Sequence, residues 1–465
     1  MLQINRRITM KPNIKLLVAL ALAPLVMFAD APQQKPNIIV MIADDLGSGD
    51  VSCLFRDVVK TPNMDRLAAM GIKFRSGYVT APVCGPSRAG FFTGRYQERF
   101  GFTSNQGGIP ANMPLLPGVL HDAGYRTGLI GKWHSAGPMP FERGCFDYSL
   151  CSPVSSPVID YHHPRLALNG KVEQFDKYST DLFADEAVKF IDSNRDKSFC
   201  LTVTFNAPHI LKVVERAPKI KEEYDAAVAS GKTLDVPKAR TARPGEAEKY
   251  AAQFPGDTAR ADTAATIAAL DQGIGRILDK LKATGLEKKT MIFLFADNGG
   301  HPENRSENLP LRDYKWTVYE GGIRVPFIAA YPGVFPAGVE YSNPVCSFDI
   351  FPTCCALAGV KPPEGLDGVN LTPFLRGEKT SAPHDCLFFD LLGMGAVRQG
   401  RWKLVLHLQG PTQLFDLSTD VEEKHDLADS QPALVKELTA KWKEWNAQMP
   451  RGPRAKKDKP ANNDE

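Results

Sequence analysis

The sequence predicts an α/β fold in which a large mixed, mostly parallel sheet is sandwiched by helices and is followed by a small C-terminal antiparallel sheet plus a helix. Continuous apolar runs without alternation, at 37–43 and 291–296, are typical of strands buried on both faces of a parallel sheet. Two segments with apolar residues at helical spacing each precede such a run: 181–193 lies before the run at 199–205, and 261–281 lies before the run at 291–296. From about Ala382 the pattern changes to short strand-like runs separated by turn residues. The 465 residues are enough for one large core and a smaller domain.

Residues 1–31 have the pattern of a cleavable signal peptide. Four basic residues precede an apolar run at 16–28, and small residues that suit a cleavage site follow it. The run is shorter than the roughly 20 residues that span a bilayer. No cysteine stands directly after the cleavage site, where a lipid anchor would be attached. We therefore expect a periplasmic or secreted protein without a membrane anchor. The net charge of +3, with no basic stripe interleaved with aromatic residues, argues against nucleic acid as a partner.

The first predicted strand, at 37–43, runs directly into Asp44 and Asp45. Open α/β sheets bind ligands at the carboxyl ends of their strands, so two acids at this place are candidate ligands. A solvated turn would be the usual reading of such a pair on its own. The pattern recurs, however, where the strand at 291–296 runs into Asp297 and Asn298.

These four side chains offer hard oxygen ligands from one sheet edge. Calcium and magnesium prefer oxygen ligands, and calcium tolerates a mixed carboxylate and amide shell better. A cation would also explain how three acids can stand together, because their mutual repulsion would otherwise raise at least one pKa. We therefore expect one Ca²⁺ per chain at this edge.

The segment 84–94 predicts a short helix with a cysteine at its start. Pro86 suits a first helical position and Gly94 suits a C-terminal stop. Cys84, just before the helix, would lie among unpaired backbone N–H groups, and Arg88 would follow one turn later on the same face. This arrangement favours an anionic ligand at position 84. The alternative is an ordinary helix start with a buried thiol.

Two more predicted strands end in basic residues. The run at 126–130 leads to Lys132 and His134, and the run at 199–205 leads to His209. Each histidine alone is more often structural, but two of them on the same inferred edge as the acids favour a site. Between 211 and 260 the sequence is polar with little periodicity, which predicts a long surface insertion near His209.

The cysteine count is nine, an odd number that invites a search for one cysteine outside any disulfide. Cys84 would be that residue. Cys145 and Cys151 are close enough in sequence for a local bridge, and the adjacent pair at 354–355 could bridge elsewhere. Plain buried thiols are an equal alternative, so no pairing is predicted.

The run Cys84-Gly85-Pro86-Ser87-Arg88, followed by Thr93-Gly94-Arg95, resembles the signature of the type I, formylglycine-dependent sulfatases of the alkaline phosphatase-like superfamily. The segments around Asp44, Lys132, His209 and Asp297 also resemble motifs of that family, in family order. Lys315, which precedes the run 319–326, matches its second active-site lysine. The resemblance covers almost all of the chain after residue 36. It implies a catalytic domain at 36–381, a C-terminal subdomain at 382–449 and a sulfuric ester hydrolase activity.

The resemblance also implies the chemistry of the site. A maturation enzyme that generates formylglycine would oxidise Cys84 to formylglycine (3-oxoalanine), whose geminal diol attacks sulfur and forms a covalent sulfated intermediate. The implied metal ligands are Asp44, Asp45, Asp297, Asn298 and residue 84. Arg88 and Lys132 would hold the oxygens of residue 84. His134 would accept a proton, and His209 with Lys315 would protonate or stabilise the leaving oxygen.

The implied sulfatase activity and the predicted export together suggest a sulfated polysaccharide or glycosaminoglycan as the substrate. His301 and Arg312 are candidate sugar contacts, although loop residues at the surface often have no such role. One alternative is a phosphoester or phosphonate hydrolase on the same scaffold, which would use two zinc ions and more histidine ligands. Another is a non-catalytic glycan-binding relative, which would have lost catalytic positions.

The C-terminal region predicts a small antiparallel sheet with a helix. Its strand-like runs are 386–392, 395–398, 402–408 and 413–416. A helix is predicted at 433–449. The charged, proline-containing residues 450–465 predict a disordered tail.

Overall fold

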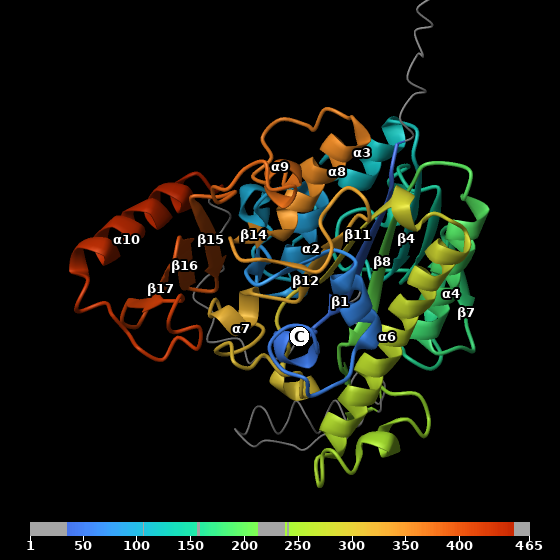
Figure 1. Ribbon diagram of the computed structural model, residues 1–465, viewed down its shortest axis with the longest axis horizontal. Coiled ribbons are helices and arrows are strands. Elements are labelled where there is room, and N and C mark those ends of the chain that lie inside the picture. The colour runs from blue at the N-terminus through green and yellow to red at the C-terminus, as the bar shows by residue number, and fades with distance from the viewer. Residues whose placement is uncertain (1–34, 106, 156–158, 213–237, 240, 451–465) are drawn as a thin grey trace, which may run out of the picture. The chain divides into compact units, whose positions relative to one another are not determined.

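Strand β1 (Asn37–Asp44) lies inside a ten-stranded sheet, and all eight of its residues are buried. The computed structural model (Figure 1) describes residues 35–105, 107–155, 159–212, 238–239 and 241–450. In spatial order the strands of the large sheet are β13 (Val339–Tyr341), β2 (Ile72–Phe74), β12 (Phe327–Ala330), β11 (Thr290–Ala296), β1, β8 (Phe199–Pro208), β4 (Arg126–Gly131), β5 (Tyr148–Cys151), β6 (Arg165–Leu168) and β7 (Lys171–Gln174).

The centre of this sheet is parallel. The neighbours β11, β1, β8, β4 and β5 all run in one direction. Antiparallel pairs occur between β11 and β12 and between β5 and β6, so the sheet is mixed. Because the central strands are parallel and adjacent, their carboxyl ends reach the same edge. The predicted fold class is therefore confirmed.

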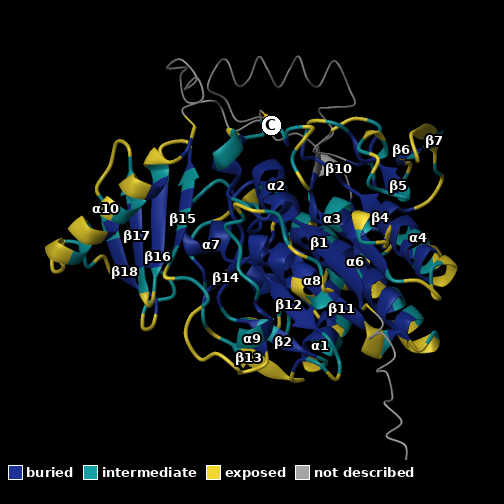
Figure 2. Ribbon diagram, turned by 90° about the horizontal axis from the view of Figure 1, so that it is seen from above, coloured by how far each residue is buried: buried dark blue, intermediate teal, exposed yellow. Residues whose placement is uncertain are grey.

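Helices cover both faces of the sheet, as its continuous apolar strands require. One group packs together and against β8, β4 and β12: α1 (Pro62–Ala69), α4 (Ser179–Ser193) and α6 (Thr258–Ala283). A second group packs together and against β4: α2 (Cys84–Thr93), α3 (Leu116–Asp122) and α8 (Ile350–Ala358). Figure 2 shows the resulting buried interior around the central strands. The helices predicted at 181–193 and 261–281 are confirmed within three residues at each end.

The C-terminal sheet has four antiparallel strands, as predicted. They are β15 (Cys386–Leu391), β16 (Met394–Gln399), β17 (Trp402–His407) and β18 (Gln413–Asp416). Helix α10 (Pro432–Ala447) packs against β16 and β17 (Figure 1). Leu387 and Phe389 of this sheet share one buried apolar cluster with Val83 and Cys84, so the sheet adjoins the start of α2.

The remaining strands and α-helices within the described residues are short. They are β3 (Gly77–Tyr78), β9 (Leu211–Lys212), β10 (Lys238–Ala239), α7 (Glu320–Ile323), β14 (Val345–Cys346) and α9 (Thr372–Leu375). β9 pairs with β10 at the base of the predicted insertion, most of which lies outside the described residues. The predicted signal peptide and all but the first residue of the predicted tail also lie outside them. All nine cysteines are described, and each is a free thiol. Among the described helices, none combines the length and the apolar character that crossing a membrane would need.

Candidate active site

The ends of β1 and β11 bring the four predicted oxygen ligands together. The two strands are parallel neighbours with Ala43 opposite Ala296, so the residues that follow them meet. The backbone N–H of Asp45 donates to Asp297 Oδ1 at 3.2 Å, and Asn298 Nδ2 donates to Asp45 Oδ1 at 2.7 Å. The side chains of all four residues, Asp44, Asp45, Asp297 and Asn298, are buried.

β4 and β8 add the predicted basic groups. Lys132 follows β4 and donates from Nζ to Asp44 Oδ2 at 2.6 Å. His209 follows β8, and its Nε2 lies 3.7 Å from Asp45 Oδ2. Its Nδ1 lies 2.8 Å from the carbonyl oxygen of Ile210, which leaves Nε2 to face the carboxylate. His134 is also buried, and its Nδ1 has no hydrogen-bond partner among the described residues.

Helix α2 supplies the cysteine and the arginine. The Sγ of Cys84 and carboxylate oxygens of Asp44 and Asp297 lie within 4.8 Å of one another. Arg88 Nε donates to Asp297 Oδ2 at 2.8 Å, and its Nη1 donates to the carbonyl oxygen of Lys132 at 2.8 Å. These bonds tie the helix to the ends of β11 and β4.

One detail of α2 differs from the prediction. Cys84 is the first helical residue, after the extended N-cap Val83, and does not precede the helix. Pro86 then falls third in the helix, where its missing N–H costs nothing because first-turn donors have no partner within the helix. Gly94 ends the helix with φ +67°, as predicted.

Lys315 reaches the site from the loop that precedes α7. Its Nζ lies 2.9 Å from Asp45 Oδ1, and its backbone N–H donates to the carbonyl oxygen of Gly300 at 3.2 Å. The neighbouring residues Asp313 and Trp316 have φ values of +67° and +75°, an unusual conformation for side-chain-bearing residues that is often found at functional sites.

The electrostatics of the site follow from its burial. Burial and the nearby Asp44 carboxylate raise the pKa of Asp297 to about 6. Burial acts in the same direction on Asp45, but the charge of Lys315 outweighs it and lowers the pKa of that carboxyl. The pKa values of His134 and His209 are both held well below the usual histidine value. Burial is the main cause, and the positive charge of Lys132 is the second.

The donor set fits a hard divalent cation. Asp44 Oδ1 and Asn298 Oδ1 are buried and accept no hydrogen bond from the described residues, so each oxygen has a free lone pair. The charges of three carboxylates are balanced by Arg88, Lys132 and Lys315. A divalent cation would therefore leave the site with two net positive charges, which favour an anionic ligand.

The two predicted sugar contacts have different surroundings. His301 follows the residues at the end of β11, and its positive charge, when it is protonated, lowers the pKa of Asp45. The ring of His301 packs edge to face on the ring of Tyr314, with 6.2 Å between the ring centres. The guanidinium of Arg312 lies 3.9 Å from the ring centre of Tyr319 and donates to the carbonyl oxygen of Glu423. Arg312 is thus joined to the C-terminal sheet region.

Sequence reasoning missed two residues that shape the site. Tyr161 donates from its hydroxyl to the carbonyl oxygens of Asn206 and His209, so it fixes the end of β8. Asn105 accepts the backbone N–H of Gly85 at 3.3 Å, beside Cys84. Neither residue lies in a strand-end motif, so no local pattern marks it.

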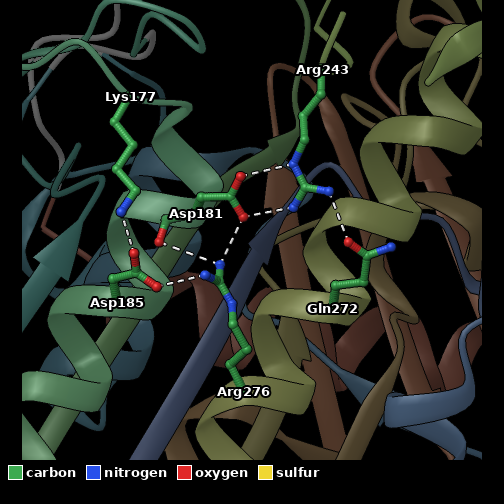
Figure 3. Close-up of a pocket in the computed structure, with 6 residues that line it drawn as sticks. All are labelled: Lys177, Asp181, Asp185, Arg243, Gln272 and Arg276. Carbon is green, nitrogen blue, oxygen red and sulfur yellow. Dashed lines mark hydrogen bonds and ion pairs between the residues drawn. The ribbon is translucent and has the colours of Figure 1, made fainter. Parts of the chain in front are cut away.

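A pocket on α4 and α6 lies outside this constellation (Figure 3). Asp181 pairs with both Arg243 and Arg276, and Asp185 pairs with Arg276 and Lys177. Because both carboxylates are already paired with these three cationic side chains, the cluster joins α4 to α6 and offers no unpaired carboxylate to a ligand.

Comparisons with known proteins agree with this geometry. The sequence matches the family model described as Sulfatase over residues 36–360 and the one described as N-sulphoglucosamine sulphohydrolase, C-terminal, over residues 312–448. It is 31% identical over 457 residues to arylsulfatase A of Bos taurus, covering 86% of this chain and 85% of that protein. It is 31% identical over 404 residues to N-acetylgalactosamine-6-sulfatase of Mus musculus, covering 78% and 71%. The crystal structure of Ps i-CgsB in complex with k-i-k-neocarrahexaose superposes with a TM-score of 0.77 at 31% identity, covering 90% of this chain and 94% of that one.

Proposed function

The chain belongs to the sulfatase family, a group of sulfuric ester hydrolases within the alkaline phosphatase-like superfamily, and we propose that it removes O-sulfate groups from a sulfated polysaccharide or glycosaminoglycan after export from the cell. One observation carries this proposal. Asp44, Asp297 and Cys84 meet at the carboxyl edge of the sheet, surrounded by three buried cationic side chains.

Residue 84 is the proposed nucleophile in its oxidised form. Burial raises the pKa of the Cys84 thiol, so the unmodified side chain is a poor nucleophile at neutral pH. A formylglycine made by a maturation enzyme would supply, as its hydrate, one hydroxyl that attacks sulfur and a second whose deprotonation releases sulfate. Arg88, one turn further along α2, orients the oxygens of residue 84 from its fixed place between Asp297 and Lys132.

Asp44, Asp45, Asp297 and Asn298, together with an oxygen of residue 84, would hold the metal ion, which we propose is calcium. The cation would withdraw charge from the sulfate oxygens and lower the pKa of a hydroxyl on residue 84. The chain's own contribution is the positively charged surroundings. With the carboxylates already balanced by cationic side chains, the added charge of the ion attracts a sulfate ester.

The two histidines have complementary proposed roles. His134 is held neutral by burial, and its Nδ1 has no hydrogen-bond partner within the described part of the chain, so it accepts the proton from residue 84. His209 presents Nε2 toward the site, because its Nδ1 is occupied by the Ile210 carbonyl. Its protonated form, which is a minor species but a strong acid because the pKa of His209 is lowered, donates to the leaving oxygen. Lys315 stabilises the charge that develops there.

The substrate class rests on the relatives and on the site rim. One relative is named for an N-acetylgalactosamine sulfate, and a similar structure holds a neocarrahexaose. Both names describe carbohydrates. At the rim of this site, His301 and the exposed ring of Tyr314 lie side by side and are suited to contact a sugar, while the proposed contact of Arg312 with sugar stays a prediction.

The test combines mass spectrometry with turnover. Protein from a host that has the maturation enzyme is digested, and the peptide that spans residues 75–95 is weighed. We expect the mass of formylglycine at residue 84, sulfate release from a panel of sulfated oligosaccharides, and no release by Cys84→Ala. An intact thiol in protein that still cleaves sulfate esters would overturn the mechanism. Faster cleavage of 4-nitrophenyl phosphate than of every sulfate ester would overturn the function.

A further inference from the structure

The loop that carries Lys315 is closed at its base. Gly321 donates its backbone N–H to the carbonyl oxygen of Arg312 at 2.7 Å, so the chain between them forms a compact loop. Lys315 lies within this loop, flanked by the left-handed residues Asp313 and Trp316. Such conformations persist only where the surrounding structure imposes them. The position of the Lys315 ammonium group therefore depends on what holds the two ends of the loop.

Both ends are held by one residue of the C-terminal region, Glu423. Its carboxylate Oε2 accepts the backbone N–H of Glu320 at 2.8 Å. Its backbone carbonyl accepts a hydrogen bond from Arg312 Nη1, also at 2.8 Å. Glu423 is 1% exposed and has a left-handed backbone with φ +51°, so it too is in a conformation that its surroundings impose.

Glu423 is itself fixed by a buried group of charges. Its Oε1 lies 3.3 Å from Nζ of Lys403, on β17, and the same ammonium group lies 2.9 Å from Glu320 Oε1. Glu320 Oε2 in turn accepts hydrogen bonds from the Tyr78 hydroxyl and from Arg324. The C-terminal sheet is thus connected through Lys403 and Glu423 to the loop that carries Lys315.

We propose that Glu423 is a positioning residue for the reaction, because it holds the loop that keeps the Lys315 ammonium group against Asp45. Glu423 touches none of the proposed reacting groups; it acts through the loop. The inference rests on the proposed function, in which Lys315 stabilises the leaving oxygen. The inference also gives Arg312 a structural role, since its hydrogen bond to the carbonyl oxygen of Glu423 holds one end of that loop.

A double-mutant cycle tests the connection. The wild type, Glu423→Ala, Lys315→Ala and the double variant are prepared as full-length protein from a maturation-competent host. They are assayed with the sulfated oligosaccharide that the wild type cleaves fastest, because stabilisation of the leaving oxygen matters most when that oxygen belongs to a sugar. We expect Glu423→Ala to lower kcat about 10- to 100-fold, because a misplacement of about 1 Å can cost on the order of 10²-fold. In the Lys315→Ala background the same change should have almost no further effect, since residues that act through one group are not additive. Glu423→Gln should recover part of kcat, because its amide oxygen can accept the Glu320 N–H.

Two controls separate positioning from stability. Leu438→Ala removes a fully buried side chain of α10 and destabilises the same region without touching the loop. Glu422→Gln changes the partly exposed residue next to Glu423. We expect both to keep kcat when assayed well below their Tm. An equal loss of kcat in Leu438→Ala at matched Tm would overturn the inference, as would an undiminished effect of Glu423→Ala in the Lys315→Ala background. Wild-type kcat in Lys315→Ala alone would instead overturn the role proposed for Lys315, and the inference with it.

Discussion

The ammonium nitrogen of Lys132 lies 2.6 Å from Asp44 Oδ2, and neither side chain is exposed to solvent. Asp44 also has Arg88 near its other oxygen, at 3.7 Å, and the carboxylate of Asp297 nearby. Lys132 therefore compensates a buried negative charge in addition to its proposed contact with residue 84. Removing one partner of such a buried pair leaves an uncompensated charge, which is much more costly than losing an ion pair at the surface.

Lys132→Met should accordingly lower both activity and stability. We expect kcat to fall about 10²–10³-fold, the usual effect of removing one preorganised charge. In EDTA the free energy of unfolding should fall by about 3–5 kcal/mol. Added Ca²⁺ should restore part of it, because the ion compensates Asp44. Urea unfolding in EDTA and in CaCl₂ measures the free energy of unfolding and the part of it that calcium restores. Lys441→Met, which breaks a surface pair, is the control; equal losses in the two variants would contradict the role of burial.

Calcium should stabilise the folded protein through the four oxygen ligands. Binding to the native state alone raises the free energy of unfolding by about 2.7 kcal/mol when the free ion is at a hundred times its Kd. We expect Tm to rise with CaCl₂ in the wild type, and this shift to vanish in Asp44→Asn and in Asp297→Asn. Asp279→Asn, at an exposed position on α6, should keep it. A calcium-dependent shift that survives in both site variants would place the ion elsewhere.

His209→Ala should slow poor leaving groups more than good ones. A general acid matters most when the departing oxygen is basic, as in a sugar, and its removal typically costs about 10²–10⁴-fold. Release of sulfate from a sulfated oligosaccharide should therefore fall much more than release from 4-nitrophenyl sulfate. The comparison needs only kcat for the two substrates. Equal losses on both would argue against His209 as the acid.

The strand-end residues of the site could be predicted because each of their motifs is local. A buried apolar run followed at once by Asp44 or Asp297 predicts both a strand and a place at its carboxyl edge. Parallel neighbours then bring these places together, as the pairing of β1 with β11 shows. Lys132 and His209 were predictable for the same reason, since β4 and β8 are the next strands along.

Contacts between distant segments could not be predicted in this way. Arg312 and Glu423 are 111 residues apart, and Glu423 lies in a turn region with no repeating pattern. The hydroxyl of Tyr161 reaches carbonyl oxygens of residues 45 and 48 positions later. Such bonds depend on the packing of whole elements, which periodicity and motif spacing do not describe. For this reason the sequence suggested a sugar contact for Arg312 but not its link to the C-terminal region.

The pair formed by His384 and Asp349 should make stability depend on pH. His384 Nε2 lies 2.9 Å from the carboxylate oxygens of Asp349, which is fully buried at the start of α8. Burial acts to lower the pKa of His384, but the adjacent carboxylate outweighs it, so the pKa is raised in the folded protein. A raised folded-state pKa means that the pair contributes its full stabilisation below the unfolded pKa of about 6.5. The contribution is lost as the pH rises through the folded-state pKa.

His384→Gln should therefore be less stable than the wild type at about pH 6, and the difference should shrink as the pH rises above the ordinary histidine range of about 6.5. Urea unfolding of both proteins across this range measures the difference directly. His425→Gln, at a position whose side chain is 80% exposed, provides the control and should change stability by at most about 0.5 kcal/mol at any pH. A deficit in His384→Gln that stays constant across the range would show that the ring contributes by packing against Phe348, and that its charge contributes nothing.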